Sequence, residues 1–168
     1  MASATWNVDA SGNWSLGSNW TPTTAADGAT YTASITKAIT ADRTITVDTN
    51  RTIGNLTFSG GTSTINWYLQ SSSTNALTLD NGGSQPAVAV TTPTYVTAKL
   101  AGTNGFVKSG AGLLAITNAG TNPNTITGTI RVTGAQGSGG YIGFSGYGAA
   151  GPLSSNVNVF PGTGGVVP

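Results

Sequence analysis

Few side chains in this sequence could perform acid–base chemistry. The 168 residues contain five acidic residues, all of them Asp, and no His or Cys. Asp42 and Asp48 form the nearest carboxylate pair outside the Asp9 segment, and paired carboxylates are the groups with which glycosidases cleave sugar bonds. Arg43 and Arg51 lie close to them in the sequence. We expect these arginines to form ion pairs with the two carboxylates, so the pair does not predict catalysis.

Two further motifs resemble functional sites only in part. The segment Asp9-Ala10-Ser11-Gly12-Asn13 begins as an oxygen-rich calcium loop does, but the later ligands, above all a bidentate Glu, are missing. An Asx-turn is the better interpretation. Lys108 precedes Ser109-Gly110-Ala111-Gly112, and a nucleophilic lysine needs a desolvated pocket, to which no sequence feature points. We therefore expect no catalytic residue, no metal site and no cofactor.

Three tryptophans near the N-terminus are the remaining candidates for a binding site. Trp6, Trp14 and Trp20 are spaced eight and six residues apart. Aromatic faces stack on the CH edges of sugar rings, so the three rings could form a glycan-binding platform. They could instead form a hydrophobic N-terminal cap, which we favour because each large ring buries much apolar area.

The composition excludes several classes of partner. Six Lys and Arg residues and five Asp residues give a net charge of +1. The basic residues are not clustered, which argues against nucleic acid as the main partner. No apolar run approaches the roughly 20 residues of a membrane-spanning helix. The first residues lack the basic and apolar regions of a signal peptide. We expect either a chain that is not exported by that route or one from which a leader has been removed.

The hydrophobic pattern predicts an all-β fold. Gly, Thr, Ser and Asn make up half of the chain, and apolar residues alternate with Thr in short segments such as Thr44–Val47 and Ala76–Leu79, which is typical of half-buried strands. Gly-rich turns separate these segments. The expected strands are centred near residues 31, 45, 56, 66, 78, 89, 97, 107, 115, 128, 142 and 158. This spacing indicates a sandwich, a barrel or a solenoid.

The composition changes near residue 103. All four Trp and all five Asp precede it, and the remaining residues are rich in Gly. We expect residues 1–103 to form an N-terminal cap with the first β coils. Residues 104–168 would then form a Gly-rich, repeat-like β segment that continues beyond residue 168 or is covered by a partner at its open edge.

Two segments resemble a known repeat. The segment from Gly105 to Ile116 (GFVKSGAGLLAI) and the strand Ile126–Val132 (ITGTIRV) resemble the autotransporter-associated β-strand repeat. The Trp-rich start of the chain resembles the lead-in found in proteins that carry such repeats. The chain departs from the family because the repeat occurs about once and because neither an export signal nor a translocator barrel is present.

The resemblance implies a right-handed parallel β-helix without catalytic residues. Proteins with such repeats include autotransporter passengers, other secreted surface proteins and bacteriophage structural proteins. Since the sequence has no export signal, we expect a structural virion protein, a capsid decoration protein, a fibre or a tail-fibre base. Its expected partners are copies of itself, as a trimer, other virion proteins and host surface glycans, and its expected location is the virion surface. The alternatives are a fragment of a secreted bacterial adhesin and, third, a polysaccharide-active β-helix enzyme.

Overall fold

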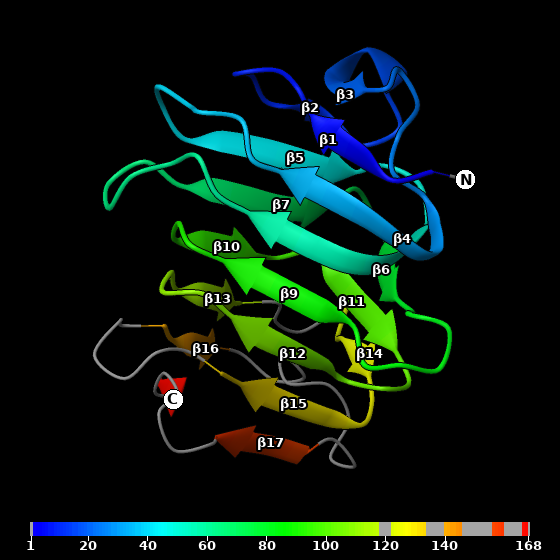
Figure 1. The fold of residues 1–168 in the computed structure, drawn as a ribbon, viewed down its shortest axis with the longest axis vertical. Coiled ribbons are helices and arrows are strands. Elements are labelled where there is room, and N and C mark those ends of the chain that lie inside the picture. Colours follow the sequence, from blue (N-terminus) through cyan, green and yellow to red (C-terminus); the bar gives the residue numbers. More distant parts are fainter. Residues whose placement is uncertain (1, 118–121, 134–139, 146–155, 160–165, 168) are drawn as a thin grey trace.

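The computed structural model describes residues 2–117, 122–133, 140–145, 156–159 and 166–167. These residues form an all-β stack of coils that descends from the N-terminus to the C-terminus in Figure 1. Their single helical element is the 3₁₀ turn η1 (Gly17–Asn19), so the described part of the chain has no helix long and apolar enough to cross a membrane.

The strands belong to two sheets. The seven-stranded sheet contains β2 (Gly12–Asn13), β5 (Arg43–Val47), β7 (Trp67–Ser71), β10 (Thr94–Val96), β13 (Leu114–Ile116), β16 (Ile142–Phe144) and β18 (Val166–Val167). The eleven-stranded sheet contains β1 (Ala4–Trp6), β3 (Trp20–Thr21), β4 (Gly28–Ile35), β6 (Arg51–Phe58), β8 (Ala76–Leu79), β9 (Ala87–Val90), β11 (Lys99–Gly102), β12 (Phe106–Ser109), β14 (Thr125–Ile126), β15 (Thr129–Val132) and β17 (Asn156–Val159).

Successive strands of each sheet pair in parallel, except for the antiparallel pair β1 and β3. Strand β6 pairs with two strands of the next coil: its first half, with Ile53, lies opposite β8, and its second half, with Asn55, lies opposite β9. Each coil therefore has three sides. In Figure 1, β4, β6, β9 and β12 run to the left in front, while β5, β7 and β10 run to the right behind them. Because the chain descends as it winds, this is the expected right-handed parallel β-helix.

Inward-facing side chains form columns along the axis of the stack. Ile45, Leu69, Val96 and Ile116 occupy one register position on successive strands of the seven-stranded sheet, and all four are at most 2% exposed. Each buried aliphatic side chain stabilises the fold by about 1.5–3 kcal/mol relative to an exposed one. The core is thus built by stacking one coil on the next.

The predicted strands are mostly confirmed, with differences at the corners of the coils. The strand expected near residue 97 is two strands, β10 and β11, and the strand expected near residue 128 is β14 and β15. Gly128, with φ of +90°, turns the chain between the latter two strands. Apolar and polar residues keep alternating through these corners, so the sequence pattern does not reveal the bend.

Glycine at the corner before β12 is required by close backbone approach. Gly105 has φ of +60°, and a Cβ there would collide with the carbonyl of Thr129 in the next coil. Gly83 also has positive φ, +89°, but a Cβ there would have no neighbour within 4 Å.

We predict that Gly83→Ala lowers the free energy of unfolding by about 1–2 kcal/mol, the strain of the left-handed conformation. Gly105→Ala should lower it by about 3 kcal/mol or more, because the two coils must also separate.

Urea unfolding followed by tryptophan fluorescence would measure both variants. Equal losses for Gly83→Ala and Gly105→Ala would contradict the close packing of coils at this corner.

Candidate functional site

The three N-terminal tryptophans pack against one another inside the first coil. Trp6, Trp14 and Trp20 are 0%, 0% and 1% exposed. The Trp6 and Trp20 rings meet edge to face with centroids 5.2 Å apart, and the centroids of Trp14 and Trp20 are 4.9 Å apart. The Trp14 Nε1–H donates to the carbonyl of Ala26, and the Trp20 Nε1–H donates to the carbonyl of Trp14, both at 2.8 Å. The rings form the cap of the solenoid, and none of them offers an exposed face on which a sugar could stack.

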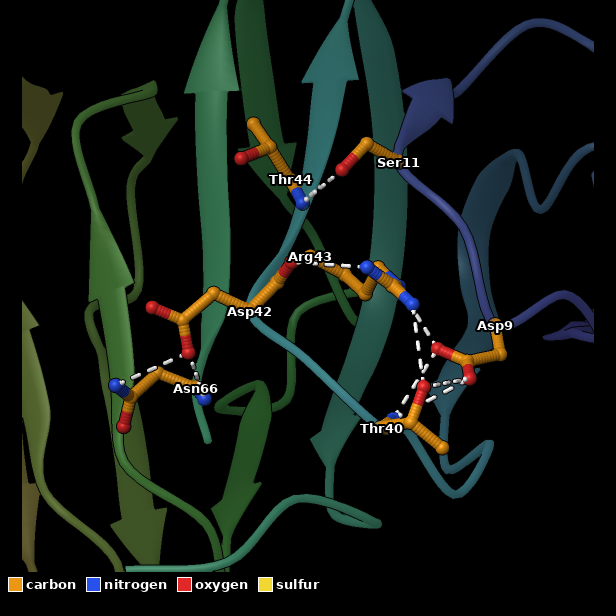
Figure 2. Close-up of polar contacts among 7 residues, drawn as sticks. All are labelled: Asp9, Ser11, Thr40, Asp42, Arg43, Thr44 and Asn66. Atoms are coloured by element: carbon orange, nitrogen blue, oxygen red, sulfur yellow. Dashed lines mark hydrogen bonds and ion pairs between the residues drawn. The ribbon is translucent and has the colours of Figure 1, made fainter. Parts of the chain in front are cut away.

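Asp9 joins the N-terminal segment to the first coil instead of forming the expected Asx-turn. Its carboxylate accepts hydrogen bonds from Arg43 Nε at 2.7 Å and from the Thr40 hydroxyl at 2.7 Å (Figure 2). The hydrogen bond from the Thr40 hydroxyl, followed by that from Arg43, holds the pKa of Asp9 below its usual value of 3.8. Nearby, the backbone N–H of Thr44 donates to the Ser11 hydroxyl at 2.9 Å. This cluster is a clamp between the segment before β2 and strand β5.

The ion pairs expected for Asp42 and Asp48 were wrong. Arg43 pairs with Asp9, and Arg51 pairs with Asp27 at 3.1 Å. Proximity in the sequence did not predict these ion pairs, because the acidic partners of Arg43 and Arg51 lie in earlier segments of the chain.

Asp42 and Asp48 themselves bind backbone groups of neighbouring segments. Asp42 accepts the N–H of Asn66 at 2.8 Å, and Asp48 accepts the N–H and hydroxyl of Ser15 at 3.0 and 2.5 Å. Asp42 and Asp48 flank the extended strand β5, which places their Cα atoms about 20 Å apart. Glycosidase carboxylates lie within about 10 Å of each other. The geometry does not suit this pair to sugar-bond cleavage.

No metal-binding cluster is found in the described part of the chain, since no three acidic side chains gather there. The Asp9 carboxylate, at the start of the calcium-loop-like segment, is directed to Thr40 and Arg43.

Lys108 is the ionisable residue whose environment the sequence analysis missed. It occupies an inward column between Val88 and Val132 and is fully buried. Its Nζ donates to the carbonyl of Gly110 at 2.6 Å. Burial lowers the pKa of Lys108 from 10.5 to about 8. The alternation of Phe106, Val107 and Lys108 could have revealed the inward position, since Phe106 and Lys108 must share a face. The Lys108 side chain is therefore not exposed at the surface.

The outer face of the seven-stranded sheet carries a pair of half-buried tyrosines. Tyr68 and Tyr95 are paired residues of β7 and β10, and their rings stack with centroids 5.2 Å apart and planes at 16°. Burial, followed by the charge of Asp42 and by Tyr95, raises the pKa of Tyr68. In the next two strands the same column continues with Ala115 and Gly143.

An open apolar groove of about 340 Å³ lies where the tyrosine column ends. Tyr141, which is 44% exposed, lines it from one side. The remaining lining includes Leu113, Ala115, Thr117, Gly143 and Ser145, and no lining residue is charged. This uncharged face is the candidate functional surface of the described chain. Sequence analysis did not find it, because small residues form a groove only when the coils bring them into register.

Comparison with known proteins returned no match among protein-family models, curated proteins or solved structures. The resemblance to the autotransporter-associated repeat therefore rests on the quoted residues alone.

The buried Lys108 predicts an unusual alkaline pH dependence of stability. Because its pKa in the folded state, about 8, lies below the 10.5 of the free side chain, the unfolded chain binds more protons between these pH values. Stability should therefore rise by about 2 kcal/mol between pH 8 and pH 10. Lys108→Met, which keeps the volume and removes the charge, should be more stable than wild type at pH 7 and should lack this rise.

Urea unfolding at one-unit pH steps from 7 to 10 would test it. A wild type whose stability is flat across this range, or a Lys108→Met variant that keeps the rise, would contradict the burial of a desolvated ammonium group.

Proposed function

We propose that this chain is a non-enzymatic structural protein of a bacteriophage virion, a capsid decoration protein, a fibre or the base of a tail fibre. It would associate with copies of itself, as a trimer, and dock on other virion proteins. The observation that carries the proposal is how the chain uses its carboxylates. Four of the five Asp side chains, Asp9, Asp27, Asp42 and Asp48, bind groups of other segments that they hold in place, which is the use expected in a scaffold.

The low charge supports the same proposal. Like charges would repeat at about 4.8 Å intervals along a column of stacked coils, and only 7% of the residues are charged. A β-helix with a buried tryptophan cap and a sparsely charged exterior suits a rigid projecting element. The resemblance of the Gly105–Ile116 segment to repeats found in bacteriophage structural proteins supports the virion setting.

The second candidate is a fragment of a secreted bacterial adhesin or autotransporter passenger. The uncharged groove beside Tyr141 favours it, because an adhesin needs an exposed recognition surface. A polysaccharide-active enzyme has no supporting observation among the described residues, since Asp42 and Asp48 lie too far apart to act together.

Fractionation of the source material tests the proposal. We predict that the native chain co-purifies with virus particles at a fixed copy number per particle, measured by quantitative mass spectrometry of the intact protein. A high copy number would indicate head decoration and a low one a tail component. Recovery of a much longer chain with a cleaved leader from cell envelopes or medium would contradict the virion function and support the adhesin.

A further inference from the structure

The sequence contains two Asn-Gly pairs, Asn81-Gly82 and Asn104-Gly105. Asn is a chemically labile residue, because the backbone nitrogen of the next residue can attack its side-chain amide. Glycine in the next position favours this attack, since it has no Cβ to hinder the nitrogen. Both pairs share this chemistry, so any difference between them in the folded protein must come from their surroundings.

Asn81-Gly82 lies in an open turn between β8 and β9. The Ser84 N–H donates to the Asn81 carbonyl at 3.1 Å and closes a tight turn around Gly82 and Gly83. Both glycines are exposed and have positive φ, +62° and +89°. Apart from the adjoining residues, a Cβ at Gly82 would have the tip of Thr30 as its one neighbour, and a Cβ at Gly83 would have none. The turn therefore has space in which its backbone can rearrange.

The proton that must leave the attacking nitrogen already has an acceptor in this turn. The Gly82 N–H donates to the Asp80 carboxylate at 2.9 Å, a distance suited to proton transfer. Asp80 and Gly82 are both exposed, so water has access to the reacting groups. The turn thus combines a mobile nucleophile, a nearby base and solvent.

Asn104-Gly105 lies in a closed corner before β12. The Gly105 N–H donates to the carbonyl of Thr127 at 2.6 Å, and Gly105 is buried. A Cβ there would collide with the carbonyl of Thr129, so the backbone of the next coil leaves no room for the movement that ring closure requires. The Gly105 nitrogen can attack only after this corner opens.

We propose that Asn81-Gly82 is a site of spontaneous deamidation in the folded protein and that the fold protects Asn104-Gly105. The Gly82 nitrogen bonds to Cγ of Asn81, and its proton passes through the Asp80 carboxylate to the leaving amide. The Cγ–Nδ2 bond breaks, and ammonia is released. Water then hydrolyses the cyclic succinimide. Opening at Cγ gives Asp, and opening at the backbone carbonyl gives isoaspartate.

The modification changes both charge and backbone in this turn. Either product lowers the net charge of the chain, which is +1, by one unit and adds a carboxylate beside Asp80. Isoaspartate also lengthens the main chain by one carbon atom between β8 and β9. The reaction needs water alone, so it does not depend on the proposed virion function.

Incubation of the full chain at neutral pH and physiological temperature, followed by tryptic peptide mapping, tests the inference. Cleavage after Lys and Arg places Asn81 in residues 52–99 and Asn104 in residues 100–108, and fragment spectra assign the modified position. The same incubation in concentrated urea gives the rates of the unfolded chain. Asn81→Gln is the matched control, because it keeps the amide but requires a larger ring that forms slowly.

We expect Asn81 to deamidate faster than Asn104 in the folded chain by about tenfold or more, because local opening must precede reaction at Gly105. In urea the two rates should be similar. The more acidic form of the chain, separated by ion exchange, should be absent from Asn81→Gln. Asp80→Ala should slow its appearance about tenfold, with circular dichroism as the check that this variant is folded.

Several outcomes would overturn the proposal. They are equal rates for Asn81 and Asn104 in the folded chain, reaction of Asn81 in urea only, or an acidic form that persists in Asn81→Gln. An unchanged or faster reaction in Asp80→Ala would overturn the role of Asp80 as the base. The comparison of Asn81 with Asn104 is made within the wild-type chain, so it decides even where a variant fails to fold.

Discussion

Each coil of this chain can bury its inward side chains only against the same positions of the coils before and after it. Parallel register keeps Ile45, Leu69, Val96 and Ile116 in one column, and the same constraint acts on every inward position. It accounts for the Thr-rich alternation, for glycine where coils approach closely, and for the scarcity of charge. Lys108 is the exception, a cation set in an apolar column, and its lowered pKa is the consequence.

Within the described chain, the N-terminal end of the core is closed by side chains of the first segments instead of by a further coil. The packed rings of Trp6, Trp14 and Trp20 provide that cover, and the contacts of Asp9 with Arg43 and of Asp48 with Ser15 hold the cap on β5. Carboxylates are thereby used for assembly of the fold. Charged side chains are scarce in the remainder of the chain as well, since only 7% of all residues are charged.

Period-two alternation was enough to predict an all-β chain and most strands, including those around residues 45, 56, 78, 89 and 107, whereas the choice of a β-helix came from the resemblance of the repeat. It could not reveal the corners, because alternation continues through them, as at Gly128. Nor could it assign charged partners, since Arg43 pairs with Asp9, 34 residues away. The groove could not be predicted for the same reason. Ala115 and Gly143 form part of it because they lie in register with Tyr95 on successive strands, and the sequence alone does not give this register.

The central claim, that stacking between adjacent coils stabilises the fold, is tested most directly by a double-mutant cycle. Ile45 and Leu69 are paired in adjacent strands, and Ile130 lies several coils away from Ile45. The account predicts a coupling energy of about 0.5–3 kcal/mol between Ile45→Ala and Leu69→Ala, and additivity within about 0.5 kcal/mol for Ile45→Ala with Ile130→Ala. Additive effects in both cycles would contradict column stacking as the source of stability.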